Sequence, residues 1–413
     1  MSEKTGTSRA WLSFFVTFLM GITVAMGMFK VPTNFGNICA ELNTSMTVAA
    51  SCMSVVGLAC IVTAVPAGAI MQKFGVKKFG LVCMAAAILE NIIGYFAPSI
   101  EILIASRLLE AISYGCISMV SAAIITNGFA PEKRGVPNGI WVMWVSLANM
   151  IVPQITTMMT ADGGSFRNVW LVVCVAQVIM TVLFIIVVKE PTGTNEEAEE
   201  EKKGSIIDGL KEPGIWAISL FGLGLAIGCG CFTGLFPTFL QSDAVGLDMA
   251  TANNIISIGN IGGLIGCLLT GFIINLVAPK NRGILAIAIA VISIICFAMQ
   301  YHLPSNVMVL TAFACFFAAV SNLNVPVALA WAPDVMKRPE ALNMALGVVM
   351  IGLNVGGALS LNIPSMLVEN AGGVWGAADP FILGFAFLGL AAAVAGHFIC
   401  RKVSAQREAA AEK

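Results

Sequence analysis

The chain has 413 residues, of which 58% are hydrophobic and only 11% are charged, and its net charge is −1. Soluble domains carry about 25% charged residues, so this composition excludes a protein whose whole surface faces water. A net charge so close to zero gives no electrostatic reason to bind nucleic acid, and we expect no nucleic-acid partner.

Twelve apolar segments follow one another along the chain, and each is long enough to cross a bilayer as a helix, which takes about 20 residues. We expect helices because lipid offers no partner for unpaired backbone groups and the segments lack the alternation of a membrane barrel. The sequence therefore predicts an all-α membrane protein with transmembrane helices at 11–38, 45–71, 79–98, 101–127, 136–159, 168–188, 214–240, 250–277, 283–301, 305–331, 341–368 and 377–400.

The basic residues predict the orientation of these spans. Of the 22 Lys and Arg residues, all except Lys30, Arg107 and Arg167 lie at the chain ends or in every second connection. Cytoplasmic connections are the ones that collect Lys and Arg. We therefore expect an integral protein of the cell inner membrane, in contact with the lipid bilayer, with both termini in the cytoplasm.

One connection, residues 189–212, is long and rich in Glu, as is typical of a solvated linker. The segments on either side of it repeat each other. Pro32-Thr33 at the end of span one matches Pro237-Thr238 at the end of span seven, and Ala130-Pro131-Glu132 matches Ala332-Pro333-Asp334. We interpret the chain as an N-terminal bundle (1–188), a cytoplasmic linker (189–212) and a C-terminal bundle (213–413). Such duplicated bundles can rock about a central site.

The loop after span two resembles the signature of the major facilitator superfamily. It reads Gly68-Ala-Ile-Met-Gln72-Lys73-Phe74-Gly75-Val76-Lys77-Lys78, with Gln72 where the family usually has Asp. The segment Pro131-Glu132-Lys133-Arg134-Gly135 resembles the family's loop between spans four and five. The resemblance implies two pseudo-symmetric six-helix bundles (the major facilitator fold), a secondary transporter working by alternating access, and a monomer. It also implies a gating role for Gly68, Gln72, Lys73, Gly75 and Lys77.

Two further stretches bear on the substrate. Trp141 to Pro153 in span five lacks the Gly-Pro of the family's antiporter signature, which disfavours a drug exporter. Phe29-Lys30-Val31-Pro32, followed by Val65-Pro66-Ala67-Gly68, looks like the prokaryotic carriers of cyanate, nitrate and nitrite. A Lys near the end of span one is also similar to monocarboxylate carriers.

Four charged residues lie inside predicted spans: Lys30, Glu90, Arg107 and Glu110. A charge near the bilayer centre costs several kcal/mol unless it is paired or hydrated, so such residues are usually functional. Counting about 1.5 Å of rise per residue places all four in one slab on the outer side of the midplane. Pairing among them is therefore feasible.

Polar residues continue from these charges along two helices. Arg107, Glu110 and Tyr114 recur at helical spacing in span four, and Lys30 and Asn34 do so in span one. A polar stripe on an apolar membrane helix faces a cavity or another helix. By the family resemblance, spans one, four, seven and ten line the cavity. We predict substrate binding by Lys30, Arg107, Tyr114 and Asn34, together with Asn322 and Asn324 beside Pro326 in span ten.

Our hypothesis is that Lys30 and Arg107 bind an anion, because the planar fork of Arg suits a carboxylate. Glu110 or Glu90 would then carry a co-transported proton, since a desolvated carboxylate takes up a proton readily. Two structural alternatives stay open. Arg107 pairs with Glu110 or Glu90 and merely ties spans three and four together, or Lys30 extends to water at the membrane surface.

The sequence thus predicts a proton-coupled secondary transporter of a small organic or inorganic anion. A carrier or exporter of a cationic or neutral small molecule is the first alternative, and a sensor built on the same bundle is the second. We expect no enzyme and no cofactor, because no nucleotide-binding loop and no nucleophile–base pair occurs in the sequence. With two His and no Cys-rich motif, we also expect no metal site.

Overall fold

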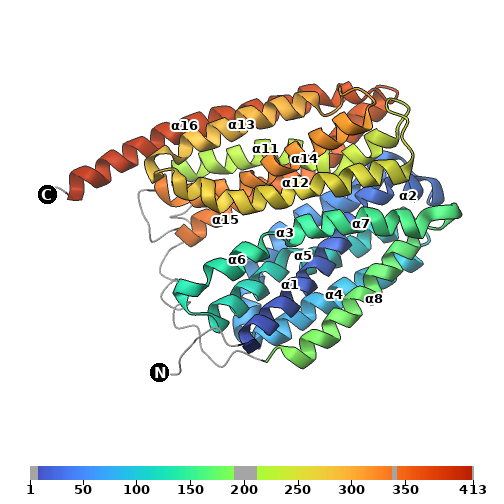
Figure 1. Cartoon of the computed structure of the whole chain (residues 1–413), viewed down its shortest axis with the longest axis horizontal. Helices are drawn as coiled ribbons and strands as arrows, with labels where there is room; N and C mark the ends of the chain where they lie inside the picture. Colours follow the sequence, from blue (N-terminus) through green and yellow to red (C-terminus); the bar gives the residue numbers. More distant parts are fainter. Residues whose placement is uncertain (1–7, 190–211, 337–341, 412–413) are drawn as a thin grey trace. The chain divides into compact units, whose positions relative to one another are not determined.

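The structure, a computed structural model, describes residues 8–189, 212–336 and 342–411 (Figure 1). Every regular element within these residues is a helix, and 12 of the helices are long and apolar enough to cross a membrane. The predicted all-α membrane fold with twelve spans is therefore confirmed. The predicted linker lies almost wholly outside the described residues, so the predicted domain limits stay a prediction.

Fourteen labelled helices follow in chain order, joined by turns and short 3-10 segments. The first eight are α1 (Ser8–Phe29), α2 (Phe35–Glu41), α3 (Met46–Phe74), α4 (Val76–Phe96), α5 (Ile100–Gly128), α6 (Gly135–Trp141), α7 (Trp144–Thr160) and α8 (Arg167–Val187). The others are α11 (Pro213–Gln241), α12 (Met249–Leu276), α13 (Arg282–Met299), α14 (Val307–Trp331), α15 (Leu342–Asn370) and α16 (Asp379–Ala411).

Span one is broken, which corrects the prediction of a single helix over 11–38. Helix α1 ends at Phe29, a 3-10 turn covers Pro32–Asn34, and α2 begins at Phe35. The physical reason is Pro32, whose ring nitrogen carries no hydrogen and cannot continue the helical hydrogen-bond ladder. Lys30 therefore lies just past the end of α1.

Span five is also divided, between Trp141 at the end of α6 and Trp144 at the start of α7. The indole rings of these two residues stack at 5.3 Å with an interplanar angle of 19°. The amide of Met143 bonds to the carbonyl of Ile140, a tight 3-10 type contact in place of the usual helical one. The predicted span over 136–159 is present, but a turn at Val142 and Met143 divides it into two helices.

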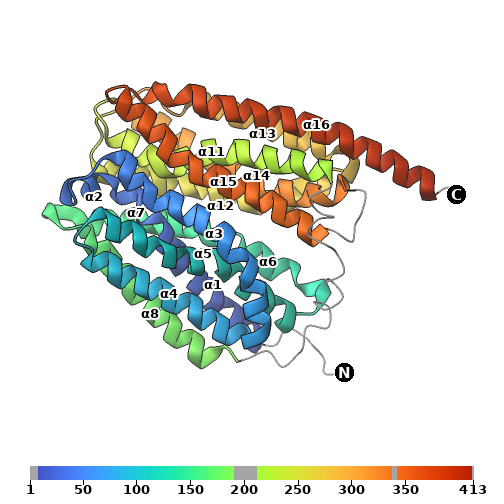
Figure 2. The same ribbon diagram turned by 180° about the vertical axis from the view of Figure 1, so that it is seen from behind.

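The described residues form two compact units, one of residues 8–189 and 237–264 and one of residues 212–236, 265–336 and 342–411. In the first unit α5 packs against α1, α3 and α4, and α8 packs against α1 and α4. Figures 1 and 2 show α1, α4, α5 and α8 side by side from opposite directions. The candidate site lies where these four helices meet.

In the second unit α13 packs against α14 and α16. Helix α11 approaches α15 closely at two glycines. A Cβ on Gly352 would lie 2.3 Å from the carbonyl oxygen of Ser219, and one on Gly356 would lie 2.5 Å from that of Leu223. Small residues of this kind let membrane helices come into backbone contact.

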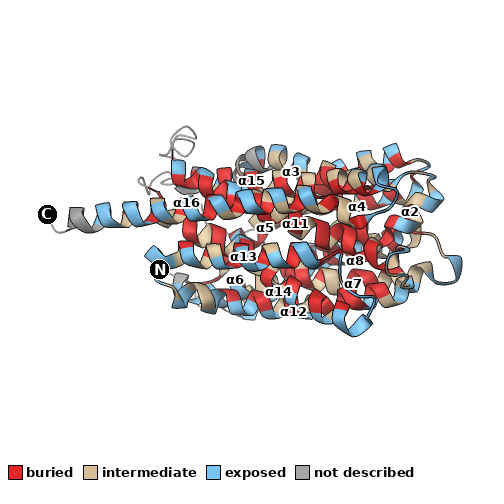
Figure 3. Ribbon diagram, turned by 90° about the horizontal axis from the view of Figure 1, so that it is seen from above, coloured by how far each residue is buried: buried red, intermediate tan, exposed pale blue. Residues whose placement is uncertain are grey.

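The outward-facing side chains are those of a protein surrounded by lipid. Phe272 is 74% exposed, Leu276 82% and Met308 80%. Large apolar side chains exposed over most of a helix length would be unfavourable in water, and they fit the hydrocarbon interior of a bilayer. Figure 3 shows exposed residues along the whole of α16; Phe387 and Phe398 are the apolar ones in its middle, and Arg401, Lys402 and Arg407 are the charged ones near its end.

Candidate functional site

The four charged residues of the membrane spans meet in one buried cluster within the first unit. Lys30 follows α1, Glu90 lies on α4, and Arg107 and Glu110 lie one helical turn apart on α5. All four side chains are 0% exposed. The prediction that one slab would bring them together is confirmed by this geometry, whereas Lys30 does not reach the surface as one alternative had it.

Glu90 stands between the two basic residues and binds both. Its Oε2 accepts a hydrogen bond from Nζ of Lys30 at 2.5 Å, and its Oε1 accepts one from Nη1 of Arg107 at 3.1 Å. Buried charges need paired partners because a lone charge in a low-dielectric interior is strongly unfavourable. The cluster contains two basic and two acidic side chains, so its formal charge is zero when all four are ionised.

Arg107 uses all five of its N–H donors on the chain itself. Nε donates to the carbonyl of Cys52 at 3.2 Å. Nη1 donates to Glu90 and to the carbonyl of Gly27 at 3.1 Å. Nη2 donates to the carbonyl of Met28 at 3.2 Å and lies 3.6 Å from its sulfur. In this conformation Arg107 has no free donor for an anion, and it ties α1, α3, α4 and α5 together.

The break in span one explains why carbonyls are available to Arg107. The last carbonyls of a helix have no partner within the helix. Met28 would normally bond to the amide of residue 32, and Pro32 has none. A cation at a helix C-terminus also interacts favourably with the helix dipole. Arg107 therefore acts as a cap on α1, a role that Pro32 indicated but the sequence did not assign.

The amino group of Lys30 is also enclosed. Besides Glu90, it donates to Oδ1 of Asn91 at 2.6 Å, and it lies 4.7 Å from the ring centroid of Trp170. Asn91 in turn bonds to Gln177 on α8 at 2.9 Å. Sequence reasoning missed these three residues, although Gln177 is a strongly polar side chain in an otherwise apolar span.

Glu110 differs from the other three charged residues. Its Oε2 lies 3.6 Å from Nη1 of Arg107, an ion pair without a hydrogen bond. Neither of its carboxylate oxygens accepts a hydrogen bond from any donor among the residues that the structure describes, although both are buried. Glu90 and Glu110 both lie close to Nη1 of Arg107, so the two carboxyl groups are neighbours around one nitrogen. The predicted pairing of Arg107 with Glu90 and Glu110 is thus present, with Glu110 the weaker partner.

The other predicted binding residues of the first half have local contacts. Asn34 is 0% exposed and donates to the carbonyl of Lys30 at 2.8 Å and to Thr156 at 3.2 Å. Tyr114 is half-buried, with its ring 6.3 Å from Phe29 and 5.5 Å from Trp144. Asn34 therefore bridges the chain break, and Tyr114 belongs to an aromatic cluster. Substrate contact by either residue stays a prediction.

In the second unit, Asn322 donates to the carbonyl of Ala318 on its own helix at 2.9 Å. Asn324 is 5% exposed and donates to the sulfur of Cys229 at 3.2 Å, and its Oδ1 is buried without a hydrogen-bond partner. Both residues belong to the second unit, whereas the charged cluster belongs to the first. Of the two, Asn324 keeps an unused acceptor that a ligand or water could bind.

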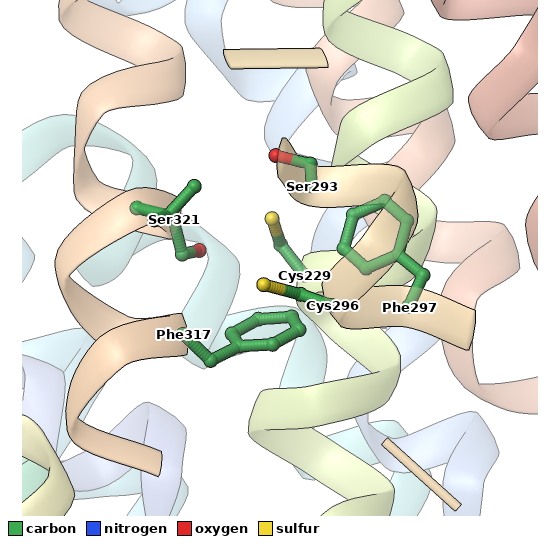
Figure 4. Close-up of a pocket in the computed structure, with 7 residues that line it drawn as sticks. Cys229, Ser293, Cys296, Phe297, Phe317 and Ser321 are labelled. Atoms are coloured by element: carbon green, nitrogen blue, oxygen red, sulfur yellow. The ribbon is translucent and has the colours of Figure 1, made fainter. Parts of the chain in front are cut away.

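Beside Asn324, α11, α13 and α14 surround a small hollow (Figure 4). The thiols of Cys229 and Cys296 lie near one another there, and the hydroxyl of Ser321 points toward them. The hollow has no charged side chain and no room for a water molecule in this conformation. Its lining consists of Cys229, Ser293, Cys296, Phe297, Phe317, Val320 and Ser321.

The predicted gating residues surround the turn between α3 and α4. Gly75 has φ +88°, a conformation that a residue with a side chain rarely adopts, and it joins the two helices directly. Lys73 is exposed, Gly68 is half-buried, and Lys77 donates to the carbonyl of Ile185 in the last turn of α8 at 2.7 Å. The side chain of Gln72 lies outside the described part, and the gating role stays a prediction.

Comparison with known proteins identifies the family. The sequence model of the Major Facilitator Superfamily matches residues 11–360. The Multidrug export protein EmrB of Haemophilus influenzae is 24% identical over 137 residues, which is 33% of this chain and 26% of that protein. The match therefore spans about a quarter of the length of that relative.

Solved structures share the fold over nearly the whole chain. A variant of the nucleoside transporter NupG has a TM-score of 0.73 with 16% identity, and the match covers 94% of this chain and 99% of that one. A bacterial homolog of the human lysosomal transporter Spinster, inward-facing and occupied, has a TM-score of 0.69 with 13% identity over 94% of this chain and 96% of that one. With twelve membrane helices, this fold and a family match over most of its length, the chain belongs to the Major Facilitator Superfamily.

Proposed function

We propose that this transporter is proton-coupled, works by alternating access, and uses Glu110 as its proton-binding carboxylate. The observation that carries the proposal is the bonding of Glu110, a fully buried carboxyl group to which no donor in the described part of the chain gives a hydrogen bond. An ionised carboxylate needs such donors when it is removed from water. A carboxylate that lacks them is the member of the cluster best suited to take up and release a proton.

A proton on Glu110 also supplies the missing hydrogen bond. Protonated Glu110 becomes a donor, and the neighbouring carboxylate of Glu90, which shares Nη1 of Arg107 with it, is the acceptor that we propose. Two neighbouring carboxyl groups that share one proton are a recurring arrangement where proton transfer takes place. Glu90, by contrast, already accepts bonds from Lys30 and Arg107.

We propose a small anion, carboxylate-like, as the substrate, because the charge of the cluster changes with this proton. With both acids ionised the cluster is neutral, and with Glu110 protonated it carries one net positive charge. An anion that bound at Arg107 in place of Glu110 would restore neutrality, so proton and anion would favour each other's binding. In the present conformation the donors of Arg107 are occupied, so anion binding requires Arg107 to release its bonds to α1.

A second candidate is a neutral or cationic substrate exchanged for protons. The bonds of Lys30 and Arg107 to the chain's own acceptors favour it, and so does the partial likeness to a multidrug export protein. In this reading a cationic substrate would compete with the proton for the unpartnered carboxylate of Glu110. The two candidates differ in the direction of proton movement, which is with the substrate for the anion and against it for the cation.

Purified protein is first screened by thermal shift against small carboxylates and small amines, since a ligand that binds the folded state raises the melting temperature. The hit is then labelled and its uptake into proteoliposomes measured with and without a pH gradient. We expect the hit to be a carboxylate that accumulates on the side of the membrane toward which protons flow. In Glu110→Gln the labelled hit should still exchange across the membrane but no longer accumulate.

The matched control is Glu132→Gln, which removes an exposed acid from the turn after α5. It should accumulate the hit like the natural chain. If Glu110→Gln responds to the pH gradient as the natural chain does, Glu110 is not the coupling group. A hit among the amines, expelled as protons enter, would replace the anion by the second candidate.

A further inference from the structure

Two neutral amides, Asn91 on α4 and Gln177 on α8, bond in series to the amino group of Lys30. Both side chains are 0% exposed. Buried amides must satisfy their donors and acceptors within the protein, so their orientation is fixed by their partners. The direction of each bond along the series can therefore be worked out.

Asn91 has only one way to face Lys30. Its Nδ2 donates to the carbonyl of Ala87 and to Oε1 of Gln177, both at 2.9 Å, which uses both amide hydrogens. Its Oδ1 is thus left for Lys30. A flipped Asn91 would place its NH2 group against an amino group, with donor facing donor.

Gln177 fixes Asn91 in the same way. Its Nε2 donates to the carbonyl of Thr23 on α1 at 3.2 Å, which turns its Oε1 toward Asn91. The series starts at Thr23 and returns to α1 at Lys30, two turns further along the chain. Lys30 has a long, flexible side chain. The bond to Asn91 restricts the position of its amino group on one side, and the ring of Trp170 covers a second side.

We propose that Asn91 and Gln177 are positioning residues that hold the amino group of Lys30 on Glu90, and that this hold makes Glu110 rather than Glu90 the proton carrier. With Lys30 on Oε2 and Arg107 on Oε1, both oxygens of Glu90 have a donor. Only one contact with Arg107, at 3.6 Å, remains for Glu110. The proposal rests on the proposed function in that Glu110 is the proton site.

The groups that face Glu110 come from every helix around it. Lys30 comes from α1, Glu90 from α4, and Arg107 from its own helix, and the ionisable side chains of Cys60 on α3 and Tyr114 on α5 also lie in its surroundings. Freeing Lys30 would remove one donor from Glu90. The proton would then bind to Glu90 more readily than in the natural chain, because Glu90 would keep only its bond to Arg107.

The test measures melting temperature against pH, over roughly pH 5 to 9, for the purified full-length protein. In Glu110→Gln, the change of melting temperature with pH that comes from ionisation of the Glu110 carboxyl group should be absent. In Gln177→Met/Glu110→Gln we expect a new pH-dependent step in the melting temperature of at least about 1 °C, because Glu90 now titrates. Met has nearly the length of Gln but no amide. If the double variant follows Glu110→Gln across the range, the positioning role is wrong.

The matched control is Thr181→Val in the same Glu110→Gln background. Thr181 lies one turn further on α8 and bonds only to the carbonyl of Gln177 in its own helix at 2.7 Å, so no new step is expected. Asn91→Leu/Glu110→Gln is the second variant and should reproduce the new step if Gln177→Met does not fold. This experiment measures melting temperature and not transport. A missing step in the double variant therefore rejects the positioning role, whereas accumulation of substrate by Glu110→Gln would reject the proposed function.

Discussion

The carboxylate of Glu110 on α5 rests against Gly27 on α1. A Cβ added to Gly27 would lie 2.8 Å from both carboxylate oxygens of Glu110. Gly27 also gives its carbonyl to Arg107 at 3.1 Å. One glycine thus provides the space for the acid and an acceptor for the cation.

Gly27→Ala should displace the Glu110 carboxyl group while leaving the fold in place. Ala is the better helix former, so the change itself does not weaken α1, but a contact under 3 Å requires the carboxylate to move. We expect proton-driven accumulation to fall at least about tenfold, equivalent to about 1.4 kcal/mol. Gly357→Ala, where nothing lies within 4 Å, is the control. Unchanged accumulation in Gly27→Ala would contradict the proposed place of Glu110 in coupling.

Arg107→Lys should be strongly destabilising although it keeps the positive charge. Lys has three donors on one atom. It cannot reproduce the five contacts of Arg107, which are three backbone carbonyls, the carboxylate of Glu90 and the sulfur of Met28. We expect a loss of about 3 kcal/mol, as for other disrupted buried ion pairs, measured by thermal or denaturant unfolding in detergent.

Arg167→Lys serves as the comparison for that change. Arg167 pairs with Glu41 at 2.9 Å, with the side chains 28% and 30% exposed. Partly exposed pairs contribute little, so the expected loss is under about 1 kcal/mol. If the two substitutions cost the same, the carbonyl bonds of Arg107 do not stabilise the bundle, and its role as a cap on α1 is wrong.

How far the sequence predicts the site depends on the kind of contact. The charges at Lys30, Glu90, Arg107 and Glu110 are visible because charge is rare in apolar spans, and topology alone places them at one depth. The pairing of Arg107 with both acids was among the stated alternatives. The number of spans can also be predicted from the sequence, because the length of each apolar segment can be read directly from its residues.

The remaining contacts depend on the backbone and on rotation of the helices. Arg107 binds carbonyls of Gly27, Met28 and Cys52, and every residue has a carbonyl, so no side-chain pattern marks them. Only Pro32 could have indicated free carbonyls at the end of α1. Gln177 could have been noticed as a polar residue in an apolar span, but which neighbour it faces depends on how α8 is rotated against α4.

Lys30 and Glu90 should show strong coupling in a double-mutant cycle. Lys30→Met removes the donor to Oε2 of Glu90, and Glu90→Gln removes the acid that both cations share. Each single change leaves a buried group short of a partner and should cost about 3 kcal/mol or more. The double variant should recover about 2 kcal/mol of the summed loss, since it removes both halves of the pair. Additive losses in unfolding measurements would indicate that the two residues are not bonded to each other.

Asp248 caps the start of α12, outside the membrane span, and should give this helix a pH-dependent stability. Its Oδ1 accepts from the amide of Thr251 at 2.9 Å and its Oδ2 from the hydroxyl of Thr251 at 2.7 Å. These hydrogen bonds hold the pKa of Asp248 below its ordinary value. Asp248→Ala should cost about 1 kcal/mol at neutral pH, the usual contribution of an N-cap.

The sign of the pH effect follows from the direction of that pKa shift. A carboxyl group whose pKa is lowered on folding stabilises the folded state above its ordinary pKa of about 3.9, and loses this contribution as the pH falls through the lowered value. The melting temperatures of the natural chain and Asp248→Ala should therefore differ at neutral pH and converge in strong acid. Asp243→Ala, which removes another exposed acid from the same loop, should follow the natural chain throughout. A gap between Asp248→Ala and the natural chain that stays constant into strong acid would mean that the charge of Asp248 plays no part in capping α12.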